Sequence, residues 1–284
     1  MNHYLLYIIL GIIQGLTELL PVSSSAHVVV AEKLMGLDPS SPEMTLLLVM
    51  LHTGTMLAVI VFFWNRWRNT VTREESPGRY ILMLIVATIV TGVIGEALIK
   101  LIEKFWLRGV PHAEVELLFS HLELIAPALA AVGILILIAG LSKTSESTKR
   151  PLDSKRSALI GAIQGLCLPF RGFSRSGATI SVAMLSGIDR AKAEDFSFAL
   201  AVILTPPAIA REVWRLVRVE HANAASAVTS DFTVSLIGFL SAFLAGLLAL
   251  KWLSKWLDQG RWYWFGIYCL FAAGVVAYLH HAGY

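Results

Sequence analysis

Long apolar stretches separated by short polar connections make up most of the chain. Two of the apolar regions, residues 3–36 and 157–190, are interrupted near their middles by Gly, Pro, Ser and charged residues. A membrane-spanning helix rarely tolerates such an interruption, whereas a helical hairpin tolerates it when its loop is buried in protein or lines a cavity. The other stretches are uninterrupted and long enough to cross a bilayer: residues 44–64, 80–102, 120–141, 196–217, 233–253 and 262–282. The pattern predicts an all-α polytopic membrane protein with about six transmembrane helices and two re-entrant helix–loop–helix hairpins.

Basic residues indicate which connections lie in the cytoplasm. Connections rich in Lys and Arg stay on the cytoplasmic side of a membrane, and three connections are rich: 65–79, 142–156 and 251–261. The intervening connections hold few basic residues. Six transmembrane helices satisfy this alternation only when both interrupted regions are re-entrant. We therefore expect both termini on the periplasmic side and the two hairpins to enter the membrane from opposite sides.

A short repeat relates the two interrupted regions. The tetrapeptide IQGL occurs at residues 13–16 and again at 163–166, and the same offset of 150 aligns Ser24 with Ser174. Three apolar stretches follow each copy, and because three is an odd number the second copy is inverted in the membrane. Such inverted repeats are common among transporters, whose sites lie near the midplane between broken helices.

The repeat divides a single integral membrane domain, residues 1–284, into two halves. We expect a first inverted repeat over 1–141, a cytoplasmic connection over 142–156 and a second inverted repeat over 157–284. Composition agrees, because 56% of the residues are hydrophobic and only 15% are charged, against about 25% charged in soluble domains. No large soluble domain fits in such a chain. The net charge of +3 is modest, and we expect no nucleic-acid partner.

The first interrupted region carries an acid in an apolar setting. Gln14 and Glu18 are four residues apart, so both side chains lie on one face of a helix. An ionised carboxylate in lipid costs a few kcal/mol or more. We therefore expect Glu18 to face a polar cavity, a metal ion or a cationic group, although a Glu that caps a helix or extends toward the interface is the alternative.

The segment PVSSSAH follows this acid. Pro21 should end the first short helix, and Ser23, Ser24 and Ser25 are natural N-cap residues for the next one. A helix N-terminus with hydroxyl groups is a suitable site for an anion, and His27 falls in the first turn. The alternative is that the serines only cap the helix and His27 only binds a carbonyl.

The second interrupted region contains RGFSRSGAT, residues 171–179. A glycine-rich, hydroxyl-rich loop that carries arginines and opens a helix is suited to holding phosphate, because Arg presents a forked set of donors. The residues that would do so are Gly172, Ser174, Arg175, Ser176, Gly177 and Thr179. A cytoplasmic loop with arginines at the interface is the alternative. At the midplane the two hairpins would place a carboxylate, an imidazole and hydroxyls opposite Arg175, and a phosphorylated lipid is the natural substrate.

Other polar side chains in apolar stretches carry weaker signals. His52 and Glu96 could line the cavity, but we favour a role as hydrogen-bond partners between helices. Glu194, Asp195 and Arg211 are expected to be helix-end charges.

The sequence resembles the BacA-type undecaprenyl-diphosphate phosphatases over essentially its whole length. Three segments carry the resemblance: QGLTELLPVSSSAH (14–27), LHTGTMLAVIVFFW (51–64) and GFSRSGATISVAMLSG (172–187). It implies hydrolysis of undecaprenyl diphosphate to undecaprenyl phosphate and inorganic phosphate, which recycles the lipid carrier of peptidoglycan and other envelope polymers and can confer bacitracin resistance. It also implies a multi-pass protein of the bacterial inner membrane, a site open to the periplasm and a divalent cation, Mg²⁺ or Ca²⁺, and it allows a homodimer.

The resemblance assigns roles to individual residues. It implies a catalytic group of Glu18, Ser24, His27 and Arg175, with the metal held by Glu18 and Gln14. Its substrate-binding residues would be Ser23, Gly172, Ser174, Ser176, Gly177 and Thr179. This chain departs from the family's pattern in three places: Gln14 where glutamate is frequent, His52 where glutamine is common, and Arg171 in place of the usual proline.

The mechanism that we expect begins with attack of Ser24 on the terminal phosphorus, with His27 or Glu18 accepting its proton. Attack by water or by His27 itself is an alternative at this point. A polyprenyl-phosphate transporter or flippase, and a lipid-binding relative without catalytic activity, are the competing functions.

Overall fold

The computed structural model of the protein describes residues 3–37, 42–73, 77–106, 118, 121–142, 150–220 and 227–283. The elements of secondary structure in these ranges are α-helices, so the predicted all-α class is confirmed. The helices are α1 (His3–Leu19), α2 (Ser24–Leu34), α3 (Pro42–Arg73), α4 (Pro77–Phe105), α5 (Leu122–Leu141), α6 (Ser154–Cys167), α7 (Arg175–Leu185), α8 (Arg190–Glu220), α9 (Ala227–Asp258) and α10 (Tyr263–His281).

Six of the described helices are long and apolar enough to cross a membrane, as the hydrophobic pattern predicted. The candidate spans lie in α3, α4, α5, α8, α9 and α10: Leu46–Thr70, Pro77–Phe105, Leu122–Leu141, Arg190–Arg211, Ser235–Asp258 and Tyr263–His281. Several helices extend beyond the apolar stretches that predicted them. The chain is therefore a multi-pass membrane protein.

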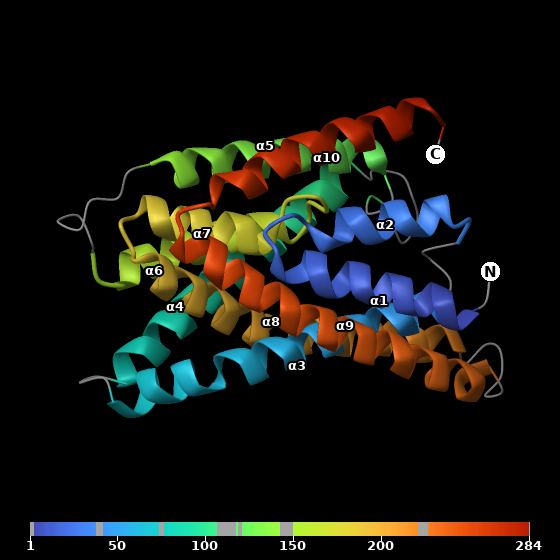
Figure 1. Cartoon of the computed structure of the whole chain (residues 1–284), viewed down its shortest axis with the longest axis horizontal. Helices are drawn as coiled ribbons and strands as arrows, with labels where there is room; N and C mark the ends of the chain where they lie inside the picture. The colour runs from blue at the N-terminus through green and yellow to red at the C-terminus, as the bar shows by residue number, and fades with distance from the viewer. Residues whose placement is uncertain are drawn as a thin grey trace.

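Two pairs of short helices lie between the long ones. Figure 1 shows α5 and α10 side by side along one face of the molecule, and α3 packed with α8 and α9 on the other. The pairs α1–α2 and α6–α7 start at opposite ends of the long axis, and their connecting turns approach each other near its middle (Figure 1). The start of α1 and the end of α10 lie at the same end of the molecule.

Glycines let the first helix of each pair approach a long helix closely. Gly11 and Gly15 of α1 contact α9, while Gly161 and Gly165 of α6 contact α4. A Cβ atom on any of the four would lie 2.3–2.9 Å from a carbonyl oxygen of the partner helix. Close helix packing in membranes uses small residues in this way. The two pairs of glycines are also separated by 150 residues.

Charged side chains outside the hairpins differ from the expectation. Glu194 is buried rather than a solvated helix-end charge: it accepts hydrogen bonds from Arg66 at 3.1 Å and from Ser254 at 2.6 Å. Arg66 also binds Asp195 at 3.2 Å. These bonds join α3, α8 and α9, because a carboxylate in an apolar interior needs compensating donors. Glu96 is exposed and pairs with Lys100 of its own helix at 3.2 Å, so it is neither a cavity residue nor a partner between helices.

Candidate active site

The turn between α1 and α2 forms the tip of the first hairpin. Ser23 has φ 69°, and it is the only non-glycine residue with a positive φ in the described parts of the chain. Such a conformation costs on the order of 1–3 kcal/mol and is found preferentially at functional sites. Ser23 does not cap α2 through its side chain as expected; its hydroxyl lies 3.2 Å from that of Ser25.

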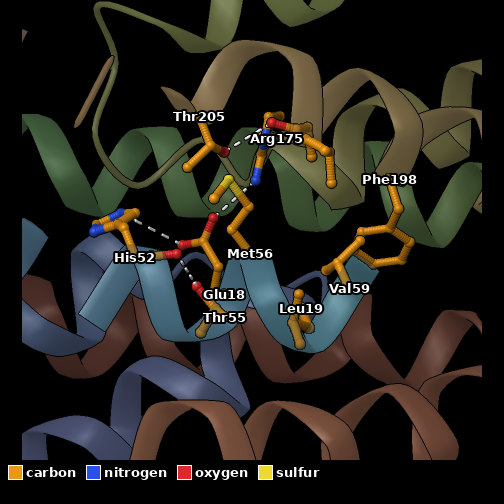
Figure 2. A pocket seen from close by; sticks show the side chains of 11 residues that line it. Glu18, Leu19, His52, Thr55, Met56, Val59, Arg175, Phe198 and Thr205 are labelled. Atoms are coloured by element: carbon orange, nitrogen blue, oxygen red, sulfur yellow. Dashed lines mark hydrogen bonds and ion pairs between the residues drawn. The ribbon is translucent and has the colours of Figure 1, made fainter. Parts of the chain in front are cut away.

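The carboxylate of Glu18 is the centre of the site. Its Oε1 accepts a hydrogen bond from Arg175 Nη2 at 2.8 Å, which links the two hairpins across 157 residues of sequence. Its Oε2 accepts a short hydrogen bond from the hydroxyl of Ser24 and a second bond, of 3.2 Å, from the Gln14 amide. Figure 2 shows the Glu18 carboxylate with one interaction toward Arg175 and another toward His52, and all three residues line the same recess. The structure thus brings the predicted acid, hydroxyl and guanidinium together.

The start of α7 forms the tip of the second hairpin. Ser174 caps the helix, because its hydroxyl accepts a hydrogen bond from the Gly177 amide at 3.3 Å, and it lies 3.4 Å from the Ser176 hydroxyl. Thr179 differs from its predicted substrate-binding role. It is fully buried, and its hydroxyl bonds the carbonyl of Arg175 at 2.8 Å and the hydroxyl of Ser197 at 2.5 Å. Thr179 therefore joins α7 to α8.

The two loop glycines serve close approach between segments of the protein. Gly172 has φ 98°, and a Cβ there would lie 2.6 Å from the carbonyl oxygen of Ile125 in α5. Its amide donates to the Ser25 hydroxyl of the other hairpin at 3.4 Å. A Cβ on Gly177 would lie 3.1 Å from the Pro21 oxygen and 2.8 Å from Ile136. Both glycines thus let the second hairpin pack against the first hairpin and α5.

Two connected cavities open onto Glu18. The first, which we call the polar cup, is about 210 Å³ and is lined by both hairpin tips: Glu18, Ser23, Ser24, Ser25, His52, Arg171, Ser174, Arg175 and Ser176, with Cys167, Leu168, Phe170 and Phe173. The second, the apolar cavity, is about 460 Å³. It shares Glu18, His52, Leu168, Arg171 and Arg175 with the cup and continues along apolar side chains of α3, α4 and α8 to Arg211.

His27 lies elsewhere, so the prediction that it faces Arg175 is wrong. Its Nδ1 donates to the carbonyl of Ser23 at 2.8 Å, which leaves Nε2 to accept a bond of 2.7 Å from the Tyr268 hydroxyl. It lines a separate cavity of about 330 Å³ bounded by α1, α2, α5 and α10. The cause is orientation: Ser24, the first residue of α2, points back toward Glu18, whereas His27 lies on the face of α2 that packs against α10.

His52 of α3 occupies the position in the site that was expected for His27. Its Nδ1 donates to the carbonyl of Leu48 at 2.9 Å, so its Nε2 points into the cavity, 3.8 Å from Glu18 Oε2. The expectation that His52 acts mainly as a hydrogen-bond partner between helices is therefore wrong, because His52 lines both cavities. The signal was present, because an ionisable side chain inside an apolar span is a candidate functional residue.

Comparison with known proteins places this fold and site in a family. The family model described as "Bacitracin resistance protein BacA" matches residues 7–276. The chain is 54% identical to "Undecaprenyl-diphosphatase 2" of Acinetobacter baylyi over 94% of its length and 95% of that protein. It is 31% identical to "Undecaprenyl-diphosphatase" of Thermodesulfovibrio yellowstonii, with 96% of each chain covered, and 33% identical to the protein of that name from Korarchaeum cryptofilum, with 93% and 94% covered. Because the matched region includes both hairpin tips and the Glu18–Arg175 pair, this chain belongs to the BacA family.

Proposed function

We propose that the protein hydrolyses undecaprenyl diphosphate to undecaprenyl phosphate and inorganic phosphate in the bacterial inner membrane. The observation that carries this proposal is the cluster of Ser24, Glu18 and Arg175 where a polar cup meets an apolar cavity. The names of the relatives state the same activity for those proteins. Recycling of the lipid carrier for cell-wall synthesis, and resistance to bacitracin, follow from that activity.

The charge and shape of the two cavities favour an anionic lipid. Among the described residues that line them, Glu18 is the only acid, whereas Arg171, Arg175 and Arg211 line one or both. Guanidinium groups that line such cavities are suited to binding an anionic ligand. The apolar cavity offers the hydrocarbon tail a path away from the cup. A diphosphate head with a polyprenyl tail satisfies both requirements.

Ser24 is the nucleophile that the geometry supports best. Its hydroxyl already donates to Glu18 Oε2, so Glu18 can accept the proton when the serine oxygen attacks the terminal phosphorus. The bond between that phosphorus and the bridging oxygen then breaks, and undecaprenyl phosphate leaves. Water hydrolyses the phosphoserine to inorganic phosphate and restores Ser24. Arg175 binds the phosphoryl oxygens and offsets their developing charge.

A divalent cation, Mg²⁺ or Ca²⁺, fits this site only together with the substrate. The described residues include no group of three His, Cys, Asp or Glu side chains placed to hold a metal. Gln14 donates its amide nitrogen to Glu18, so its amide oxygen remains available as a ligand beside the Glu18 carboxylate. Magnesium is commonly bound by one or two carboxylates and phosphate oxygens of a substrate. The cation would supply additional charge neutralisation on the diphosphate.

Phosphate release from undecaprenyl diphosphate by the purified protein tests the proposal. Ser24→Ala should lower kcat on the order of 10³-fold or more, because the nucleophile is lost, and Arg175→Ala should lower it by roughly 10³-fold through loss of charge stabilisation. Ser142→Ala is the matched control, since among the described residues the exposed hydroxyl of Ser142, the C-cap of α5, bonds the carbonyl of Ile138 in that helix. Near-normal turnover by Ser24→Ala or Arg175→Ala would refute the assigned site.

A polyprenyl-phosphate flippase is the competing function, and the opposed hairpins of Figure 1 are the observation that favours it. The same preparation separates the two functions. Transfer of a labelled polyprenyl phosphate between the two leaflets of a vesicle membrane, with no phosphate released from the diphosphate, would favour a flippase. Binding with neither transfer nor release would favour a relative without catalytic activity.

We also propose the membrane arrangement that the basic residues indicate. The halves 1–141 and 157–284 form inverted repeats, α1–α2 and α6–α7 are re-entrant hairpins, both termini are periplasmic and the site opens to the periplasm. The recurring glycine contacts at an offset of 150 support the repeat. The meeting of the hairpin turns near the middle of the molecule supports re-entrance (Figure 1). A homodimer is compatible with this arrangement.

A further inference from the structure

Arg171 is a second arginine at the junction of the two cavities. It precedes Gly172 in the loop that connects α6 to α7, and its half-buried side chain lines both the polar cup and the apolar cavity. Arg175 lines the same two cavities. Arg211 lines the apolar cavity, where it lies beyond the apolar side chains, and is absent from the lining of the cup.

The backbone holds Arg171 in place. The Phe173 amide donates to the carbonyl of Phe170 at 3.1 Å, which closes a turn around Arg171. The Gly172 amide binds Ser25 of the first hairpin at 3.4 Å, and the glycine's close approach to α5 fixes the other side of the loop. These contacts fix the backbone on both sides of Arg171.

A diphosphate presents two phosphoryl groups, and two arginines, Arg171 and Arg175, line the junction of the two cavities. Arg175 is bound to Glu18 at 2.8 Å, beside Ser24, so it serves the phosphoryl group that is attacked. The other phosphoryl group, which carries the lipid, must lie toward the apolar cavity that receives the tail. Arg171 is the other guanidinium that borders both cavities, and its forked donors suit phosphate oxygens.

Glu32 of α2 is a buried acidic residue in the neighbourhood of Arg171. This carboxylate is buried and interacts electrostatically with Arg171. An arginine with a nearby buried acid is part of a charge arrangement in the protein interior rather than a solvated loop residue. A phosphoryl group entering the junction would compete with Glu32 for the guanidinium.

We propose, on the basis of the proposed function, that Arg171 binds the phosphoryl group that remains on the lipid, while Arg175 binds the group that is transferred. Arg171 thereby selects diphosphates over monophosphates.

Binding of two probes to the purified full-length protein tests this assignment without any turnover. The probes are methylenediphosphonate, which cannot be hydrolysed, and inorganic phosphate, each measured by titration calorimetry. Arg171→Ala should weaken methylenediphosphonate binding by about 10- to 100-fold, the value of a charge-assisted hydrogen bond, and change phosphate binding by less than about twofold. Arg171→Lys should fall between, because a lysine keeps the charge but not the fork.

Two further variants sharpen the test. Arg261→Ala removes an exposed arginine remote from the cavity linings and should leave both affinities unchanged. Glu32→Gln should strengthen methylenediphosphonate binding, because it removes the competing carboxylate, and it addresses the same contact if Arg171→Ala does not fold. Equal losses for both probes, or no loss for either, in Arg171→Ala or Arg171→Lys would overturn the assignment. If the unsubstituted protein prefers methylenediphosphonate to phosphate but releases no phosphate from undecaprenyl diphosphate, the result would count against the proposed function alone.

Discussion

At the scale of single residues, Glu18 holds the site together because its two carboxylate oxygens bind different partners. One oxygen binds Arg175 of the other hairpin, and the second accepts the Ser24 hydroxyl. A carboxylate within a membrane protein is stabilised only by such donors. The same bonds that make Glu18 tolerable in this interior therefore place the proposed nucleophile beside the arginine that binds phosphate.

Substitution of His52 tests whether its position beside Glu18 matters. His52→Leu would place an apolar side chain against the carboxylate and should lower kcat/KM by roughly 10-fold or more, since a polar neighbour of a buried charge contributes about 1–3 kcal/mol. His52→Gln keeps a polar side chain and should lose less. Phosphate release measures both variants, and His280→Gln, at the end of α10, is the control. Full activity of His52→Leu would contradict a contribution of His52 to the activity of the site.

At the scale of elements, close glycine contacts help to position the two hairpins against the long helices. The contacts of α1 with α9 and of α6 with α4 bring backbones together at four glycines. Because the hairpin tips carry Ser24 and Arg175, small displacements of α1 or α6 would separate groups that now lie within hydrogen-bond distance. The precision of the site therefore depends on helix packing remote from it.

Gly161→Ala tests this dependence. Its Cβ would lie 2.3 Å from the Ala87 oxygen, so α6 must shift, at a cost of about 1–3 kcal/mol. We expect a lower thermal unfolding midpoint in detergent and a fall in kcat. Gly92→Ala is the matched control, because a Cβ on Gly92 of α4 would contact no atom within 4 Å, and alanine favours a helix. Equal midpoints for the two variants would contradict the role of the glycine contact.

At the scale of the whole molecule, the turns of the α1–α2 and α6–α7 hairpins approach each other near the middle (Figure 1). A lipid substrate reaches such a site through the bilayer, so its charged head enters a polar cup while its tail stays in hydrocarbon. The apolar cavity between α3, α4 and α8 provides that route. The arrangement explains how a water-soluble product, inorganic phosphate, can arise from a substrate that never leaves the membrane.

Cysteine labelling tests the orientation of the molecule. The native Cys167 and Cys269 are buried, so they should react little with a membrane-impermeant maleimide. The exposed Lys255 lies near the end of α9, just before the turn into α10, whereas the exposed His281 lies at the far end of α10, so α10 separates the two positions. In spheroplasts, His281→Cys should be labelled, and Lys255→Cys only after permeabilisation. The reverse pattern would place the termini in the cytoplasm and invert the proposed topology.

The helical class, the six candidate spans and the two interrupted regions can be predicted from the sequence, because the length of an apolar stretch and its breaks are local properties. The sequence also indicated Glu18, Ser24 and Arg175, because polar and charged side chains in apolar segments are costly and are therefore candidate functional residues. Their roles remain predictions for experiment, but their proximity is a property of the structure.

Which side chains contact one another depends on the tertiary structure. His27 and His52 are both imidazoles in apolar stretches, and the direction of each about its helix axis sends one to Tyr268 and the other to Glu18. Thr179 lies in the predicted loop motif, yet its hydroxyl is used in packing against α8. The physical reason is common to all three: composition fixes what a residue can do, whereas the rotation and packing of distant helices fix what it contacts.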